Sequence, residues 1–328
     1  MPGFVVRKDN GDLRWYPLFQ VGSNVTFYPP DDVETGIKVG DNWEFEVYLP
    51  GYWDPGHPSR FRKRIGGGSG LVVLEEDGDL RYYPFRDETF FVDDTGRRVG
   101  RGFLPEWDYY VAEWTDNGTS DLIVRDDEGK LRLYPWNGRE FDDLGRSKFI
   151  GDGFDKEKYP DLLPGYWRGQ NFPDLMVRRE NGELHLYPFN GHTFRDQGRP
   201  ERVGRGFGKD FTHYMAEEWT RNGTTDLMVR KKNKDLMLYQ FGRLDPNRDS
   251  NVFANPPYPV TGRGFKDDWH YLPGFWREGG RPDLMVCDDD DNMRFYPFEG
   301  TKFIDLEKDI KRVGRGWKFT HYWDFYPM

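Results

Sequence analysis

The sequence predicts an all-β protein that forms one closed, six-bladed β-propeller over residues 1–328, as a single domain. Two observations lead to this prediction. Four short motifs recur six times in the same order, at intervals of roughly 50 residues, and a four-stranded β unit repeated at this spacing is typical of propellers. The two ends of the chain also carry complementary parts of one repeat, and closing a ring removes exposed sheet edges.

The first motif is a short apolar strand that usually begins with Asp. Clear copies are Asp121–Arg125, Asp174–Arg178, Asp226–Arg230 and Asp283–Cys287, and weaker copies are Gly3–Arg7 and Gly70–Leu74. We expect the arginines that close this motif, such as Arg125, to pair with neighbouring carboxylates.

The second motif follows a turn rich in Asp, Asn and Gly, and it alternates apolar and polar residues as a half-buried strand does. Each copy contains a tyrosine that we expect to be structural: Tyr16, Tyr83, Tyr134, Tyr187, Tyr239 and Tyr296. Proline follows it in five copies, and proline ends ladder pairing.

The third motif is Val-Gly-Arg-Gly-Phe or a variant, and its paired glycines predict a bulge or a turn with positive φ. The fourth contains an aromatic column: Tyr48, Tyr110, Leu162 (the exception), Tyr214, Tyr271 and Tyr322. A tryptophan follows in five copies: Trp53, Trp114, Trp167, Trp219 and Trp276.

The chain ends on the fourth motif and begins on the first. We therefore expect a closing strand over residues 320–326, beside residues 4–7. A second period is also visible: Pro-Gly-aromatic-Trp alternates with Ala-Glu before the tryptophan, so the ring reads as three doublets, and any sites should fall into two alternating classes. Two insertions, over residues 54–69 and 242–259, are expected to be surface loops.

Composition narrows the function. Aromatic residues reach 17% and the net charge is −10, which argues against a nucleic-acid binder or docking on an anionic membrane. The single cysteine, Cys287, excludes an intramolecular disulfide. No apolar run has the length of a membrane span. The first residues lack an apolar leader, so we expect a cytoplasmic protein, or one released without a signal peptide.

In their order and spacing these motifs resemble the FG-GAP/VCBS-type repeat and, more closely, the propeller lectins of the Psathyrella velutina type and their bacterial relatives. The resemblance covers the whole chain and implies a carbohydrate-binding propeller. Those lectins usually have seven blades, and six are counted here. In FG-GAP repeats the loop before Asp-Leu often binds calcium. Two loops here, Glu113–Asp121 and Glu218–Asp226, keep that outline but offer few carboxylates, so we expect Asn-Gly turns, with calcium as the alternative.

No motif of a common hydrolase or phosphate-binding enzyme is present, and features kept in nearly every repeat favour multivalent binding. We therefore expect no catalytic residues. We also expect no bound metal, because three of the six histidines occupy one repeat position in three different units. The function hypothesis is a multivalent lectin with shallow pockets between blades and glycans or glycoconjugates as partners. The predicted ligand-binding residues are the five tryptophans, as stacking groups, and the glycine-flanked Arg101, Arg205, Arg263 and Arg315, as polar partners.

Two alternatives stay open. One is a protein-interaction scaffold, for example associated with a toxin or a secretion system, whose partner binds loops 54–69 and 242–259. The other is a glycoside-acting hydrolase, because carboxylates are abundant.

Overall fold

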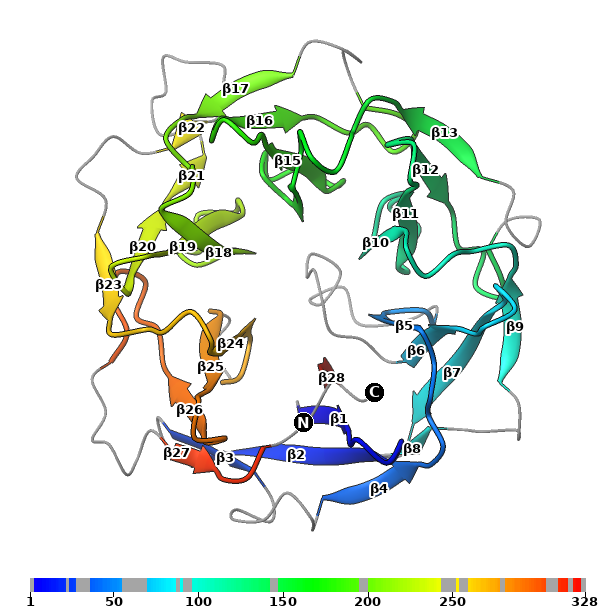
Figure 1. Ribbon diagram of the computed structural model, residues 1–328, viewed down its shortest axis with the longest axis horizontal. Coiled ribbons are helices and arrows are strands. Elements are labelled where there is room, and N and C mark those ends of the chain that lie inside the picture. Colours follow the sequence, from blue (N-terminus) through cyan, green and yellow to red (C-terminus); the bar gives the residue numbers. More distant parts are fainter. Residues whose placement is uncertain are drawn as a thin grey trace.

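The six repeats form six antiparallel sheets arranged around a central axis (Figure 1). The computed structural model describes residues 3–21, 24–27, 36–54, 70–86, 89–90, 96–141, 147–194, 200–242, 252–253, 259–277, 281–304, 312–317 and 321–325. Within these ranges all regular structure is β. The predicted six-bladed all-β propeller is confirmed.

Each blade has four main strands, numbered here from the axis outward. The innermost strands are β28 (His321–Phe325), β5 (Val47–Gly51), β10 (Asp108–Ala112), β14 (Asp161–Gly165), β18 (Phe211–Glu217) and β24 (His270–Gly274). The second strands are β1 (Gly3–Arg7), β6 (Gly70–Leu74), β11 (Asp121–Arg125), β15 (Asp174–Arg178), β19 (Asp226–Lys231) and β25 (Asp283–Cys287). These lists define blades 1 to 6 in order.

The third strands are β2 (Leu13–Val21), β7 (Leu80–Arg86), β12 (Leu131–Tyr134), β16 (Leu184–Tyr187), β20 (Asp235–Tyr239) and β26 (Met293–Tyr296). The outer strands are β4 (Ile37–Gly40), β9 (Arg97–Gly100), β13 (Lys148–Gly151), β17 (Glu201–Gly204), β23 (Val260–Arg263) and β27 (Arg312–Gly314). Short additional strands are β3 (Asn24–Phe27), β8 (Thr89–Phe90), β21 (Phe241–Gly242) and β22 (Val252–Phe253).

The ring closes through its two ends. Strand β28 pairs antiparallel with β1, with His321 opposite Arg7 and Phe325 opposite Gly3. The predicted closing strand is therefore confirmed, and the first and last strands of the chain lie side by side in blade 1 (Figure 1).

The second strands are apolar throughout because both of their faces are covered. In β11, Leu122 and Val124 pack into the cluster between blades 2 and 3, whereas Ile123 packs into the cluster between blades 3 and 4. Six such clusters occur, and each joins two neighbouring blades. The core is thus a ring of interfaces between sheets.

One aromatic pair recurs at all six junctions and explains the tyrosine column. The aromatic residue that ends the glycine motif packs on the column tyrosine of the next blade, with ring centroids 4.8 Å apart for Phe103 and Tyr134. The same pair closes the ring, since Trp317 of blade 6 lies 4.8 Å from Tyr16 of blade 1. The remaining pairs are Trp43–Tyr83, Phe154–Tyr187, Phe207–Tyr239 and Phe265–Tyr296.

Strand register corrects one column. Tyr109, not Tyr110, faces Val124 in blade 3 as Tyr214 faces Val229 in blade 5. The Tyr109 hydroxyl donates to the carbonyl of Leu104 at 2.6 Å, as Tyr48 donates to Trp43 at 2.7 Å. The sequence predicts Tyr110 at this position, which is wrong by one residue because Tyr109 and Tyr110 are adjacent.

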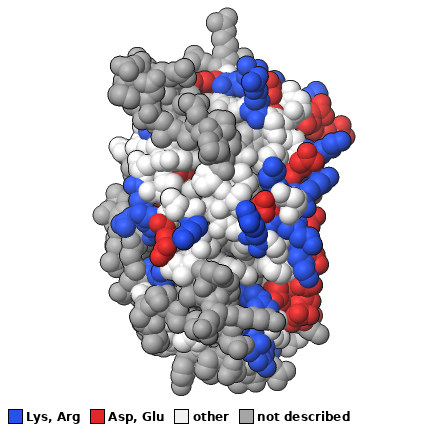
Figure 2. All heavy atoms as spheres, turned by 90° about the vertical axis from the view of Figure 1, so that its left-hand side faces the viewer, with Lys and Arg blue, Asp and Glu red and all other residues white. Residues whose placement is uncertain are grey.

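Seen from the side of blade 5, cationic and anionic side chains are interspersed (Figure 2). Within the described residues, no helix is both long and apolar enough to cross a membrane.

Candidate functional site

The five predicted stacking tryptophans lie in the core. Trp53, Trp114, Trp167 and Trp219 have no exposed surface, and Trp276 is 1% exposed. Each ring folds back along its own inner strand, and its indole N–H donates to the carbonyl four residues earlier, as Trp167 does to Leu163 at 3.0 Å. A ring that protein atoms cover completely offers no face to a sugar. The structure therefore corrects this column to a packing role.

The four glycine-flanked arginines are all exposed: Arg101, Arg205, Arg263 and Arg315. Each precedes a glycine with positive φ, for example Gly102 at 77°, and a Cβ added to Gly102 would meet no atom within 4 Å. This glycine is therefore required for its backbone conformation, not for space. The turn closes because the following aromatic N–H donates to the turn between the second and third strands, as Phe103 does to Gly78.

The structure does not bring the tryptophans and these arginines together. The tryptophans follow the innermost strands, whereas the arginines follow the outermost strands. In a four-stranded antiparallel blade these two strands run in opposite directions, so their ends lie at opposite faces of the ring. We call the face that carries the loops between first and second strands the tryptophan face.

In three blades the arginine that closes the second strand pairs with a carboxylate, as predicted. Arg125 contacts Asp108 at 2.5 Å, and Arg230 contacts Asp267 at 2.8 Å. Arg178 pairs with Asp161, and Arg7 donates to the carbonyl of Trp43 at 2.5 Å. The Arg125 and Arg178 ion pairs lie within blades 3 and 4, whereas the Arg230 pair joins blade 5 to blade 6.

A fully buried aspartate at the start of the second strand organises the tryptophan face in four blades. In blade 3, Asp121 accepts from the backbone N–H and hydroxyl of Thr115, both at 2.8 Å, and from the backbone N–H of Trp136 at 2.8 Å. Asp226 in blade 5 has the same Thr220 and Phe241 partners. Burial raises the pKa of Asp121 to about 7 and of Asp226 to about 6, although the donated hydrogen bonds oppose this shift.

Arginine replaces the threonine in blades 4 and 6. Arg168 donates to Asp174 through Nε at 3.0 Å and Nη2 at 2.7 Å, and Arg277 clasps Asp283 in the same way. Burial raises the pKa of Asp174 too, against the pull of Arg168. The doublet period of the sequence thus appears as two alternating kinds of clasp.

Blades 1 and 2 have glycine where the others have aspartate. A Cβ on Gly3 would lie 2.4 Å from the Trp15 ring, and one on Gly70 would lie 2.7 Å from the Tyr82 ring. Trp15 and Tyr82 stand where other blades have Leu or Phe. Larger rings therefore fill the space that the missing aspartate leaves.

The two loops with a calcium-motif outline are closed turns. In blade 3, Glu113 accepts from the N–H of Gly118 at 2.7 Å, and Asn117 accepts from the N–H and hydroxyl of Thr119. Glu218 and Asn222 repeat this arrangement in blade 5. The contacts are those of an Asn-Gly turn, in which the loop's own donors bind one oxygen of each glutamate and the amide oxygen of each asparagine. Calcium at these loops stays a prediction.

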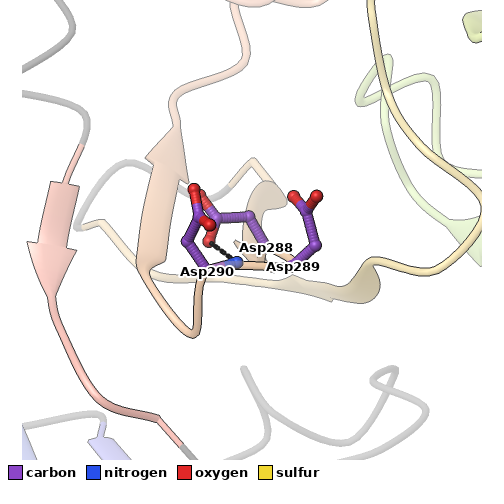
Figure 3. A group of neighbouring side chains, drawn as sticks. All are labelled: Asp288, Asp289 and Asp290. Atoms are coloured by element: carbon purple, nitrogen blue, oxygen red, sulfur yellow. Dashed lines mark hydrogen bonds between the residues drawn. The ribbon is translucent and has the colours of Figure 1, made fainter.

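A group of three carboxylates occurs elsewhere, at Asp288, Asp289 and Asp290 in blade 6 (Figure 3). Asp288 accepts from the N–H groups of Asp290 and Asn292 and from Arg294. Asp126 does the same in the corresponding turn of blade 3, where Asp127 and Glu128 follow it. Asp288 therefore caps a turn, whereas Asp289 accepts from Trp269 and pairs with Lys266.

Loops on the tryptophan face are joined in pairs. The N–H of Thr225 in blade 5 donates to the carbonyl of Tyr166 in blade 4 at 3.2 Å. Between blades 3 and 2, Ser120 and Tyr52 exchange two bonds of 2.8 Å. The loops approach so closely that a Cβ on Gly169 would lie 2.6 Å from the Gly223 carbonyl.

The pair formed by blades 4 and 5 encloses a small hollow at its rim. Its lining residues are Tyr166, Ala216, Glu217, Glu218, Gly223, Thr224 and Thr225. We call this site the 4/5 hollow. The sequence did not predict this site, although three of its lining residues, Ala216, Glu217 and Glu218, belong to the Ala-Glu motif that alternates along the chain.

The corresponding positions between blades 2 and 3 are closed. Glu113 and Gly118 are buried. Of their counterparts in blade 5, Glu218 is half-buried and Gly223 is exposed. The repeat thus gives Glu218 and Gly223 counterparts of the same type, whereas Ala216 and Glu217 correspond to Val111 and Ala112. Of these two junctions, the one between blades 4 and 5 is the open one among the described residues. The two insertions proposed as partner loops lie mostly outside the described residues, because the structure does not describe residues 55–69, 243–251 and 254–258.

Fold and site together define a six-bladed propeller whose open hollow lies between two blades. No protein-family model matches the chain, and no curated protein matches it. Among solved structures it resembles an Agrocybe aegerita lectin that recognises non-reducing terminal N-acetylglucosamine, with TM-score 0.59, 14% identity, and coverage of 96% of this chain and 77% of that chain.

It also resembles the BP39L lectin of Burkholderia pseudomallei, with TM-score 0.50, 14% identity, and coverage of 93% and 81%. A third neighbour is the Photorhabdus luminescens Tc holotoxin pore, with TM-score 0.54 and 15% identity; the match covers 89% of this chain but 13% of that one. At these identities the likeness concerns the fold.

Proposed function

We propose that this chain is a non-catalytic carbohydrate-binding propeller that holds a sugar in the 4/5 hollow. The observation that carries the proposal is the set of residues that line the hollow, which includes the acidic residues Glu217 and Glu218, Thr224, and the largely buried Tyr166. Sugars present many hydroxyl groups, so a site for them needs a few fixed polar groups, and the half-buried Glu217 and Glu218 supply such groups here.

The rigidity of the hollow supports binding. The Thr224 hydroxyl lies 2.8 Å from Asn222 Oδ1 and 2.6 Å from the Phe241 carbonyl, and the Thr225 N–H is fixed on Tyr166. A wall that is already ordered loses little conformational entropy when a ligand binds. The two lectins with the same fold make this function the first to test.

The absence of catalysis is part of the proposal. Asp121, Asp174 and Asp226, whose pKa values are raised, have no exposed surface. A carboxyl group sealed in the core cannot reach a glycosidic bond, so these shifts are explained by burial alone.

Filling the hollow tests the proposal. Ala216→Leu places a larger side chain in the lining, and we expect it to weaken binding on a glycan array at least tenfold while the circular dichroism spectrum stays unchanged. The matched control is Val111→Leu, because Val111 faces Leu122 in blade 3 as Ala216 faces Leu227 in blade 5. If the intact chain binds no glycan, or if both variants bind like the parent, the proposal is wrong.

A second candidate is a protein-interaction scaffold, favoured by the likeness to the holotoxin pore. In this case the insertions would carry specificity. Deleting residues 55–69 should then abolish capture of the partner and leave sugar binding in the 4/5 hollow intact; loss of both would point to a folding defect and would count against the scaffold.

A further inference from the structure

We infer that the 4/5 hollow selects sugars without negative charge, either neutral or amine-bearing, and rejects carboxylated or sulfated ones. This inference rests on the proposed function and adds the ligand class and the number of sites. Its basis is the charge of the lining, the way one carboxylate is fixed, and the closure of the equivalent site between blades 2 and 3.

The lining carries charge of one sign. Glu217 and Glu218 are both half-buried, and the hollow has no lysine or arginine among its lining residues. Carboxylates accept hydrogen bonds from sugar hydroxyls and attract ammonium groups, whereas a ligand carboxylate or sulfate at the same distance meets like charge. Like-charge contacts are a common way for a site to reject a wrong partner.

One carboxylate oxygen of Glu218 is fixed by a backbone hydrogen bond, and the other is not. Its Oε1 accepts from the Gly223 N–H at 2.9 Å, which fixes the carboxylate against the wall of the hollow. Its Oε2 accepts no hydrogen bond from the described residues, so this atom is available to a ligand donor. A charge-assisted bond from a hydroxyl or an ammonium group to a fixed carboxylate is stronger than one between neutral groups.

The repeat provides an internal comparison. Glu113 makes the same bond, to Gly118, but it is 6% exposed and lies in a closed junction. The Glu-Gly pair is thus present twice, although Ala112 stands where blade 5 has Glu217, and among the described residues the open copy is between blades 4 and 5. We therefore expect one sugar bound per chain at these two junctions, not two.

The test is an array that carries glucose and galactose, each as the neutral sugar, the 2-amino sugar and the uronic acid on one spacer, followed by calorimetry on the best series. In low salt the neutral and amino sugars should bind at least tenfold more tightly than the uronic acid, and added salt should narrow this gap. The stoichiometry should be one.

The variants are Glu218→Gln, alone and combined with Glu217→Gln. Because a glutamine Oε1 still accepts from Gly223, the loop should stay folded, and the double variant should narrow the gap to about threefold or less. Glu113→Gln is the control for repeat position, and Glu157→Gln, which is exposed, is the control for net charge; both should keep the parent's selectivity.

Three results would overturn the inference: equal or tighter binding of the uronic acid, two equivalent sites, or a Glu113→Gln variant that loses selectivity as Glu218→Gln does. Binding without charge selection would overturn this inference alone. If no sugar binds in any form, the proposed function fails and the inference fails with it.

Discussion

Removal of Arg168 should destabilise blade 4 by an amount that depends on pH. Asp174 has no exposed surface, and Arg168 is 16% exposed. Arg168→Ala takes away two charge-assisted bonds, of 3.0 and 2.7 Å, and leaves Asp174 with the N–H of Phe189 as its remaining partner outside that loop. Breaking one side of a buried ion pair costs about 3–5 kcal/mol.

We expect the lower end of this range, about 3 kcal/mol at pH 8, because water reaches the arginine side of the pair. For 328 residues an unfolding entropy of about 2.1 cal/mol/K per residue converts this loss to a fall in Tm of about 4 °C. Thr115→Ala in blade 3 removes one of several hydrogen bonds to Asp121 and leaves the backbone N–H groups of Thr115 and Trp136 as donors, so it should cost only about 1.5 kcal/mol.

The pH dependence follows from the aspartate. Burial already raises the pKa of Asp174 in the folded protein, and loss of Arg168 raises it further. Between the unfolded and folded pKa values the folded state binds the extra proton, so lowering the pH in this window favours folding. The deficit of Arg168→Ala should therefore be largest at pH 8 and shrink toward pH 5.

Urea unfolding of parent and variant at pH 8 and pH 5 measures this deficit. Arg202→Ala is a surface control, because Arg202 is 59% exposed and pairs with Glu183 at 3.0 Å; its cost should stay below about 1 kcal/mol. A deficit for Arg168→Ala that is equal at both pH values, or larger at pH 5, would refute the reasoning.

Three further predictions concern the core, the buried carboxyls and the ring closure. Trp167→Phe should lower the free energy of unfolding by about 1–3 kcal/mol and leave sugar affinity unchanged, because the ring is buried; a large loss of affinity with an intact fold would restore it as a stacking group. A carbon-13 NMR titration of Asp121 should show a midpoint near 7, so that this group's contribution to stability grows as the pH falls from 7 toward 4; a midpoint below 4 would contradict the burial argument. Deleting β28 removes the partner of β1 and should abolish cooperative thermal unfolding, whereas a sharp, unchanged transition would argue against closure by the termini.

The fold could be predicted because its causes repeat. The apolar second strands, the column tyrosines and the Gly-x-Gly turns each recur in register, and a ring of identical junctions needs the same residue at the same place. The closing strand followed from the same logic, since the chain begins and ends within one blade. The prediction was wrong at one position of the aromatic column in the fourth motif, where Tyr109 and not Tyr110 occupies the repeat position.

The site could not be read in the same way. A tryptophan such as Trp167 recurs in five blades because the junctions between blades must be filled by large side chains. Recurrence along the sequence therefore indicated core residues and not ligand-binding residues. The open hollow depends on differences between blades: Glu218 is half-buried and its equivalent Glu113 is buried. The Ala-Glu alternation was the signal in the sequence, but accessibility arises only when neighbouring loops are placed against each other.

The most direct test of a sugar-binding hollow is a crystal structure of the chain with the best sugar from the array. We predict density for one sugar in the 4/5 hollow, with a hydroxyl or amino group within hydrogen-bond distance of Glu218. Density on the opposite face, at the turns that carry Arg101 and Arg205, with an empty 4/5 hollow, would contradict the account.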